Sequence, residues 1–353
     1  MLGTITLGLA KGLREFFFSD PTGRVGLSEF VLNRDAIQEA ISTLSVECAR
    51  SPVSQACGLQ WSIENLRMKG FLLFGLSWLI SSSLWAYAVQ DDRRHVLEFQ
   101  APPQRIVSLL PSLSEMVCAL KACERLVGVD RYSNFPKALK NVNSVGGGLD
   151  PNVEAIVALK PDVVLMSQAP RAIERLESLG LKVMVLEAKN LADVDRIILV
   201  LGVLLGSEEA KPLLSSLHLD LQALAASVSP KVRGARVYFE VNRGPYAASE
   251  SSFVGEILQK LGAQNIVPGH WGPFPLINPE FVVKASPDLI LISASEAPNL
   301  ASRPGWSAIG ALKTQHICAL SKEQDDVLVR PGPRMAQGAQ ILAHCLSSLG
   351  GLE

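Results

Sequence analysis

The feature that most constrains the fold is a segment that occurs twice. Asn152–Ser167 reads NVEAIVALKPDVVLMS, and Asn278–Ser293 reads NPEFVVKASPDLILIS. In each copy a helical stretch ends at Pro-Asp, because proline blocks helix continuation and aspartate favours a turn, and an apolar strand-like run follows. One copy falls in each half of the chain, so the sequence predicts two related α/β lobes that face each other across a ligand cleft.

Short apolar runs alternate with helical patterns over most of the chain, which is typical of α/β units with parallel central sheets. One helix is expected to open at Ser112-x-x-Glu115, where serine and glutamate have the spacing of a capping box. The strand candidates are Arg105–Leu109, Leu126–Val129, Asp162–Met166, Lys182–Leu186, Arg236–Val241, Asp288–Ser293 and His316–Leu320. Later helix candidates are Phe253–Leu261, Pro279–Ala285 and about Arg334–Leu349.

No strand pattern occurs between residues 191 and 229. Leu191–Leu205 is strongly apolar, and Ser207–Ser227 has leucines at helical spacing. Pro212 is expected to kink this second helix or to set its start. We interpret the segment as a long rigid backbone helix that joins the lobes, the alternative being one more packing helix. The predicted domains are 89–190 for the N-terminal lobe, 191–229 for the linking helices and 230–353 for the C-terminal lobe.

Residues 68–88 have the three parts of a secretory signal peptide. A basic start at Lys69 precedes the apolar run Phe71–Ile80, and Ala86-Tyr87-Ala88 supplies an A-x-A cleavage motif. The apolar run is shorter than the ~20 residues that a membrane-spanning helix needs. No cysteine stands near the cleavage point to accept a lipid, so we expect a soluble periplasmic protein that is cleaved after Ala88.

A signal peptide belongs at the N-terminus, so residues 1–67 have two interpretations. In the first, translation begins at Met68 and the extension is a mis-assigned upstream segment. In the second, residues 71–88 are a signal anchor and 1–67 a small cytoplasmic segment. The extension carries no motif that gives it a role.

Composition and motif content argue against several classes of protein. The net charge of −1 lacks the basic excess that a nucleic-acid partner demands. The six cysteines are scattered over 353 residues without a CxxC pair, which favours neither a disulfide scaffold nor a zinc knuckle. The five histidines are isolated, so no metal site is expected. No nucleophile elbow, P-loop or HExxH motif occurs, and we expect a binding protein rather than an enzyme.

Several segments together resemble one family. They are RIVSLLPSLSE (Arg105–Glu115), LVGVDRYSNFP (Leu126–Pro136), NVEAIVALKPDVVL (Asn152–Leu165), LGLKVMVLE (Leu179–Glu187) and RPGPR (Arg330–Arg334). With the repeat and the long helix, they make the chain similar to the helical-backbone (class III) periplasmic solute-binding proteins of ABC importers. These proteins serve the uptake of corrinoids, iron siderophores and haem, and the likeness is greatest to those that bind cobalamin.

The resemblance implies roles for single residues. Glu154 and Glu280 stand where the family has one glutamate per lobe to contact arginines of the dimeric permease; the alternative is that each only caps its own helix. Tyr132 belongs to the YS-x-aromatic-P motif, whose tyrosine lines the cleft. Pro273-Phe274-Pro275 stands where cobalamin binders have Pro-Trp-Pro.

The chain also departs from the cobalamin-binding pattern. Two tryptophans of that pattern are replaced by Gly146-Gly147-Gly148 and by Ser167-Gln168. Cys345 fits one partner of the family's disulfide, whereas Leu261 stands at the position of the other.

The ligand cleft is expected to present aromatic faces and a few forked cationic donors. Tyr246 has ordinary packing as an alternative, and Arg334 has a salt bridge near the start of the last helix. The candidates are Tyr132, Tyr246, Trp271, Phe274, Arg243, Arg330 and Arg334.

These observations predict a monomeric periplasmic protein that captures a corrinoid and delivers it to an inner-membrane ABC permease dimer. Cobalamin is the leading candidate for the corrinoid. The protein itself needs no cofactor, since the cobalt belongs to the ligand. One alternative keeps the fold and binds an iron siderophore or haem. Another is a membrane-anchored sensor or scaffold in which residues 1–67 act in the cytoplasm.

Overall fold

The computed structural model describes residues 87–242 and 245–350. The chain divides into two units, Met1–Ser82 and Ser83–Glu353, and all the described residues belong to the second. The predicted extension and nearly all of the predicted signal peptide therefore lie outside the described residues. Tyr87 and Ala88, which cleavage after Ala88 would remove, form half of strand β1 (Tyr87–Gln90). The cleavage position stays a prediction.

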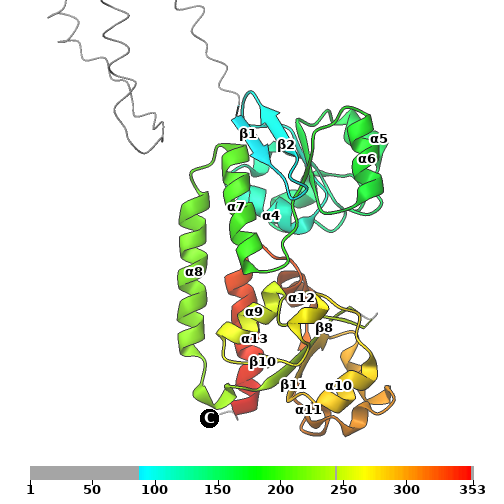
Figure 1. The fold of residues 1–353 in the computed structure, drawn as a ribbon, viewed down its shortest axis with the longest axis vertical. Helices are drawn as coiled ribbons and strands as arrows, with labels where there is room; N and C mark the ends of the chain where they lie inside the picture. Colours follow the sequence, from blue (N-terminus) through cyan, green and yellow to red (C-terminus); the bar gives the residue numbers. More distant parts are fainter. Residues whose placement is uncertain (1–86, 243–244, 351–353) are drawn as a thin grey trace, which may run out of the picture. The chain divides into compact units, whose positions relative to one another are not determined.

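The N-terminal lobe is built on a parallel sheet with the strand order β5-β4-β3-β6-β7 (Figure 1). The strands are β3 (Ile106–Ser108), β4 (Leu126–Val129), β5 (Asn143–Ser144), β6 (Val163–Met166) and β7 (Val183–Val185). The helices are α4 (Pro111–Ala119), α5 (Val153–Ala158) and α6 (Pro170–Ser178). An antiparallel pair that the sequence did not predict, β1 with β2 (Val96–Phe99), precedes them.

The C-terminal lobe repeats this architecture with the order β10-β8-β11-β12, all parallel. Its strands are β8 (Arg236–Asn242), β10 (Gln264–Asn265), β11 (Leu289–Ser293) and β12 (Ile317–Leu320), and a short β9 (Tyr246–Ala247) pairs antiparallel with β8. Its helices are α9 (Phe253–Lys260), α10 (Pro279–Ala285), α11 (Gly310–Lys313), α12 (Lys322–Leu328) and α13 (Met335–Ser347). The predicted fold of two lobes with parallel central sheets is confirmed.

Two helices connect the lobes. Helix α7 (Leu191–Leu205) ends at Gly206, whose φ of 63° is the left-handed geometry that glycine adopts at low cost. The longer α8 (Ala210–Ser227) begins just before Pro212, which therefore sets the start of the helix and does not kink it. Helix α7 contacts α4 and β1, whereas α8 contacts α7, α9 and α13. The predicted backbone helix is thus α8, which contacts α9 and α13 of the C-terminal lobe directly and packs on α7, which in turn contacts α4 and β1 of the N-terminal lobe.

The internal repeat is a repeat of hydrogen bonds as well as of sequence. Asp162 of the first Pro-Asp accepts the backbone N–H of Arg105, and Asp288 of the second accepts that of Arg236, both at 2.8 Å. The side chains of these two arginines donate to the last carbonyls of α5 and α10. Each aspartate therefore fixes the start of the neighbouring strand, a role beyond the predicted turn.

The predicted capping box at Ser112 and Glu115 is wrong. Helix α4 begins one residue earlier, with Pro111 at its first position and Leu110 as an N-cap without a side-chain bond. Proline favours that position because its ring presets the helical φ. Glu115 is therefore free to point away from the helix start, and it is 2% exposed.

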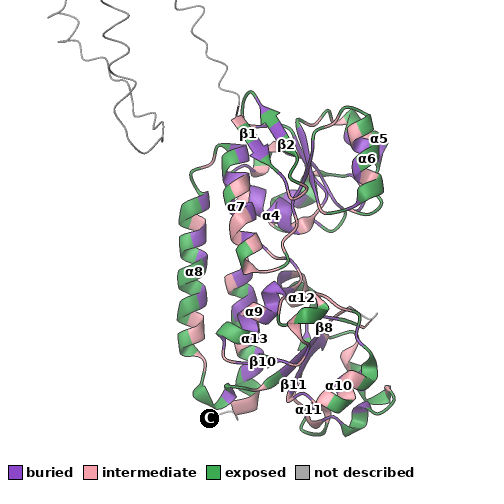
Figure 2. Ribbon diagram, in the orientation of Figure 1, coloured by how far each residue is buried: buried purple, intermediate pink, exposed green. Residues whose placement is uncertain are grey.

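Burial follows the predicted pattern of two-sided sheets (Figure 2). Every residue of β6 is buried, as expected for parallel strands that are covered on both faces. One apolar cluster includes residues of both lobes and of α7, α8 and α13, and each lobe adds a smaller cluster of its own. No helix among residues 87–242 and 245–350 is long and apolar enough to cross a membrane.

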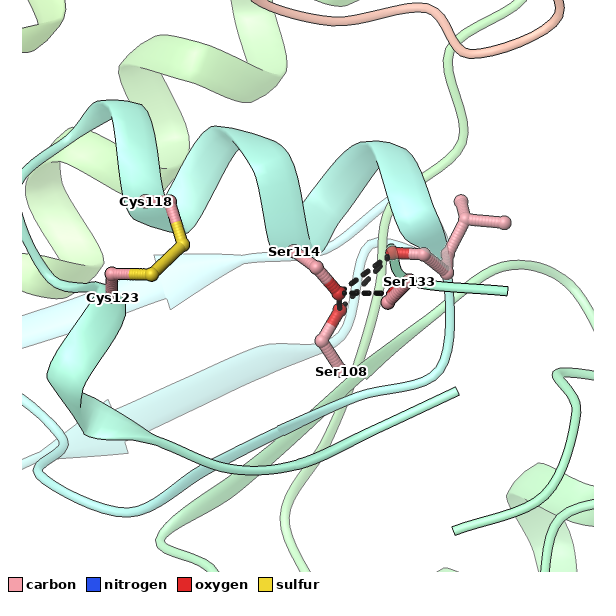
Figure 3. Close-up of a disulfide and its surroundings, with 6 residues drawn as sticks. Ser108, Ser114, Cys118, Cys123 and Ser133 are labelled. Carbon is pink, nitrogen blue, oxygen red and sulfur yellow. Dashed lines mark hydrogen bonds between the residues drawn. A yellow bond between two sulfur atoms is a disulfide. The ribbon is translucent and has the colours of Figure 1, made fainter. Parts of the chain in front are cut away.

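Two disulfides lie in the described part of the chain. Cys118 pairs with Cys123 at the end of α4 (Figure 3), and Cys318 of β12 pairs with Cys345 of α13. The departure from the family's disulfide at position 261 stands, because Leu261 is a core residue and Cys345 pairs with Cys318 instead. The sequence predicted neither pair, because the spacing of the cysteines does not show which elements the fold brings together, such as β12 and α13.

Candidate ligand-binding cleft

A cleft of about 610 Å³ lies between the lobes. Its N-terminal wall comes from the segments that follow β3, β4, β6 and β7, because the carboxyl ends of parallel strands meet at one edge of the sheet. The N-terminal lobe contributes Leu110, Pro111, Ser112, Arg131, Tyr132, Asn134, Ser167, Glu187 and Ala188. The C-terminal lobe contributes Phe253, Phe274, Lys322, Asp326, Val329, Arg330 and Pro331.

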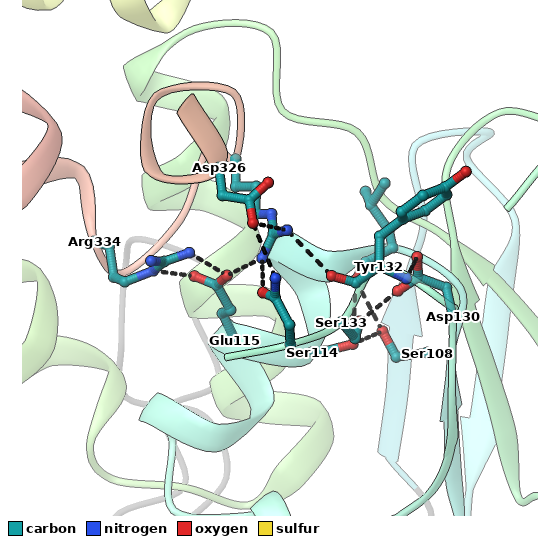
Figure 4. A network of polar contacts seen from close by, with 11 residues as sticks. Ser108, Ser114, Glu115, Asp130, Tyr132, Ser133, Asp326 and Arg334 are labelled. Atoms are coloured by element: carbon teal, nitrogen blue, oxygen red, sulfur yellow. Dashed lines mark hydrogen bonds and ion pairs between the residues drawn. The ribbon is translucent and has the colours of Figure 1, made fainter. Parts of the chain in front are cut away.

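Tyr132 offers the most exposed ring in the cleft, with 60% of the residue accessible. Its backbone N–H donates to Asp130 Oδ2 at 3.0 Å, and its carbonyl accepts from Arg330 Nη2 at 3.1 Å (Figure 4). The peptide of Tyr132 is therefore held on both sides, by its own lobe and by the opposite one. The predicted cleft role of this residue agrees with its place.

A buried hydroxyl network lies beneath Tyr132. Ser133 Oγ donates to Asp130 Oδ1 and contacts Ser114 Oγ at 2.9 Å, and Ser114 Oγ donates to Ser108 Oγ at 2.9 Å (Figures 3 and 4). Burial raises the pKa of the Asp130 carboxyl above its usual value, and the bonds from Ser133 and Tyr132 offset this only in part. Asp130 thus anchors the loop that carries the tyrosine.

The C-terminal lobe supplies an aromatic wall. Phe274 packs on Phe253 with ring centroids 5.9 Å apart, and both line the cleft. Phe274 was predicted, whereas Phe253 was missed because it reads as an ordinary residue at the start of a helix. The two rings and Tyr132 give the cleft apolar surfaces from both lobes, which suits a flat ligand.

The two predicted arginines of the RPGPR segment are occupied within the protein. Arg330 lines the cleft but is 7% exposed, and its guanidinium pairs with Glu115 and Asp326 and donates to Asn134. Arg334 is not among the residues that line the cleft. Its guanidinium donates two bonds to Glu115, which is the salt bridge predicted as the alternative to a ligand contact.

The cationic groups that do reach the cleft are others. Arg131 lines it with 45% of its side chain exposed, and its guanidinium pairs with Asp150 at 2.6 Å. Lys322, at the start of α12, lines the opposite wall. Arg131 stands directly before Tyr132 in the segment LVGVDRYSNFP, so its place beside a predicted cleft residue was a signal in the sequence.

Three further candidates do not reach this cleft or cannot be placed. Tyr246 is 45% exposed and forms a bridge with Leu276. Trp271 is 43% exposed and packs edge-on against Phe281 with centroids 4.8 Å apart. Neither is among the lining residues. Arg243 lies outside the described residues.

The two predicted docking glutamates occupy equivalent places in the two lobes. Glu154 and Glu280 are exposed in the first turns of α5 and α10. Asn152 and Asn278 cap these helices, so neither glutamate supplies the capping oxygen. Glu154 has one contact with Arg175, at 3.5 Å on an exposed surface, where such pairs contribute little.

A second groove, of about 760 Å³, lies among α7, α8 and α9. It includes the exposed pair of Asp195 and His218 at 2.9 Å. The cleft between the lobes is the stronger candidate although it is smaller, because two sheets direct their loops and rings into it. In the described part of the chain, no three or more His, Cys, Asp or Glu side chains group to hold a metal ion.

Known proteins of similar sequence and structure identify the family. The sequence profile of periplasmic binding proteins matches residues 106–323. The ABC transporter substrate-binding lipoprotein YvrC of Bacillus subtilis, itself uncharacterized, is 30% identical over 277 residues, which cover 75% of this chain and 87% of that protein. A vitamin B12-binding protein of Pectobacterium carotovorum is 26% identical over 255 residues, which cover 70% of this chain and 90% of that protein.

The solved structures give the same answer. A periplasmic haem-binding protein from Pseudomonas aeruginosa is similar with a TM-score of 0.59 at 25% identity, over 69% of this chain and 92% of that chain. The profile covers more than half of the present chain and spans both lobes and the helices between them. The chain therefore belongs to the periplasmic binding protein family.

Proposed function

We propose that this protein captures a corrinoid in the cleft between its lobes and delivers it to a dimeric ABC permease of the inner membrane. Cobalamin is the leading candidate among the corrinoids. One observation carries the proposal: Tyr132 and the Phe253–Phe274 pair face one cleft from opposite lobes. Aromatic faces bind a flat, largely apolar ligand by contact area, and a few polar groups then orient it. The similarity to a vitamin B12-binding protein supports this ligand.

Haem or an iron siderophore is the second candidate ligand. Two tryptophans of the cobalamin-binding pattern are absent: Gly146-Gly147-Gly148 replaces one, and Ser167, which lines the cleft, stands at the position of the other. Arg131 and Lys322 in the lining would pair with carboxylates, which haem carries. The similarity to a haem-binding structure supports this alternative.

Equilibrium dialysis of the protein against cyanocobalamin, haemin and a ferric siderophore tests the proposal. Capture of a scarce nutrient calls for a dissociation constant on the order of nanomolar, about −12 kcal/mol. We expect cyanocobalamin to bind at that level, and absence of binding at micromolar cyanocobalamin contradicts the corrinoid proposal. Tight binding of haemin alone, weakened by Arg131→Ala, selects the second candidate.

Export and delivery complete the proposal. Formation of two disulfides fits an oxidising compartment such as the periplasm, because cytosolic thiols are kept reduced. The exposed Glu154 and Glu280, one per lobe at equivalent helix starts, fit a partner with two equivalent basic surfaces. The protein is proposed to act as a monomer that binds its ligand without changing it chemically.

A further inference from the structure

A buried ion cluster joins the two lobes at the edge of the cleft. Glu115 of α4, in the N-terminal lobe, is 2% exposed and accepts from two arginines of the C-terminal lobe (Figure 4). Its Oε1 accepts from Arg330 Nη1 at 3.1 Å and from Arg334 Nη2 at 2.5 Å, and its Oε2 accepts from Arg334 Nε at 2.7 Å. One carboxylate therefore holds two cations that follow α12.

The cluster continues into the ligand cleft. Arg330 donates to the carbonyl of Tyr132 at 3.1 Å and to Asn134 Oδ1 at 2.8 Å. The amide of Asn134 donates to Asp326 Oδ2 at 2.9 Å, which also pairs with Arg330 at 2.9 Å. All four residues line the cleft, and Glu115 does not. The bonds of Asn134 and Tyr132 thus cross from one lobe to the other at the wall of the cleft.

We propose that Glu115 is a positioning residue that holds the lobes at the spacing in which the cleft binds its ligand. It acts through Arg330, which fixes the peptide of Tyr132 from the opposite lobe. Water does not compete for bonds that are this well buried, so they hold more strongly than surface pairs. The inference rests on the proposed function for its ligand, but the spacing of the lobes is measurable without one.

Removal of the Glu115 charge has a defined consequence. Arg330 would then keep Asp326 as its partner, but Arg334 would lose both of its bonds to a carboxylate, and a buried charge that is left uncompensated is strongly unfavourable. Movement of the lobes apart would return both guanidinium groups to water. Molecules with separated lobes do not bind the ligand, so the apparent affinity falls in proportion to the fraction of molecules that remain competent. If about one molecule in ten remains competent, the apparent dissociation constant rises about tenfold.

Glu115→Gln is the test variant, and Glu240→Gln is its matched control. Glu240 is also buried and accepts two bonds from one arginine, Arg303, at 2.7 and 2.8 Å. That pair lies within the C-terminal lobe. Both variants therefore remove a buried carboxylate charge beside arginine, but only one removes a link between lobes.

Two measurements compare the variants with the wild type. Double electron–electron resonance reports the distance between labels at the exposed Leu179 and Thr314, one in each lobe, introduced on non-natural amino acids to leave the disulfides intact. We expect a broader and longer distribution in Glu115→Gln and the wild-type distribution in Glu240→Gln. Dialysis against cyanocobalamin and haemin should show about a tenfold weaker affinity in Glu115→Gln and less than a twofold change in the control.

The outcomes separate this inference from the proposed function. A wild-type protein that binds neither probe contradicts the corrinoid and haem proposals, and the label distances still decide the role of Glu115. A Glu115→Gln variant with the wild-type distances and affinity overturns the inference, as does an equal loss of affinity in both variants. If Glu115→Gln does not fold, Glu115→Asp retains the charge with a shorter reach, and an intermediate widening in that variant supports the link.

Discussion

Asp130 shows how a single buried group can hold a binding loop in place. Its carboxylate accepts the N–H of Tyr132 and the hydroxyl of Ser133, in a site that water barely reaches. These bonds fix the conformation of the loop after β4, and this loop carries the exposed ring of Tyr132. The arrangement costs free energy at neutral pH because the charge is desolvated.

This cost predicts a pH dependence for Asp130→Asn. Burial raises the pKa of Asp130 in the folded protein above the usual 3.8, so the folded state binds the proton more tightly than the unfolded state. The free energy of unfolding of the wild type should therefore rise relative to that of the variant as the pH falls through the folded-state pKa. Urea unfolding of both proteins between about pH 7 and pH 4 measures this difference. A difference that is constant or falls with acidification contradicts the assignment.

At the scale of residues, the sequence predicted part of the cleft lining but not the partners of its charged groups. Tyr132 and Phe274 were predicted in the cleft and line it. Arg330 and Arg334 were predicted as ligand contacts, yet their donors are used by Glu115. A sequence shows that an arginine is present, but only the folded chain shows which carboxylate lies beside it. The pairing joins residues more than two hundred positions apart.

At the scale of elements, the repeat predicted more than any other pattern. Its Pro-Asp motif places an aspartate where two strands begin, so the same local chemistry builds the same βα unit in both lobes. The pair β1 and β2 was missed, and so were β5, β9 and β10, because strands of two residues leave no periodic signal. The N-terminal wall of the cleft follows predicted strands and Phe253 begins a predicted helix, whereas α12, which carries Lys322 and Asp326, was not predicted.

The two disulfides should differ in how much they stabilise the protein, because they close loops of different length. Cys318 and Cys345 are 27 residues apart, and Cys118 and Cys123 are 5 apart. Chain-entropy estimates for loops of these sizes are about 3.5 and about 2 kcal/mol. Cys318→Ala/Cys345→Ala should therefore lower the free energy of unfolding more than Cys118→Ala/Cys123→Ala, as measured by urea denaturation under oxidising conditions. The reverse order would show that loop size does not govern the effect.

At the scale of the whole molecule, two sheets and a bracing helix form a preorganised cleft. Helix α8 contacts α7 as well as α9 and α13, and one apolar cluster includes residues of both lobes. Preorganisation raises affinity because less conformational freedom is lost on binding. The fold of two lobes followed from the sequence, whereas the lining of the cleft depended on loops whose contacts cross between lobes.

The proposed docking to a permease involves both lobes together. Glu154→Ala/Glu280→Ala should lower ligand uptake by proteoliposomes that contain the permease at least about tenfold, because charge pairs at an interface are lost. The affinity for the ligand should stay unchanged, since neither residue lines the cleft. Glu208→Ala, an exposed glutamate between α7 and α8, is the control and should keep full uptake. A large loss of ligand affinity in the double variant would place the glutamates in the binding site instead.

Calorimetric titration of cyanocobalamin into two tryptophan variants tests the account most directly. Ala188→Trp fills the cleft between the lobes, and Ala225→Trp fills the groove among α7, α8 and α9. We predict one corrinoid per molecule with nanomolar affinity in the wild type and in Ala225→Trp, and at least about a hundredfold weaker binding in Ala188→Trp. Undiminished binding by Ala188→Trp, or its loss in Ala225→Trp alone, would contradict a ligand site between the lobes.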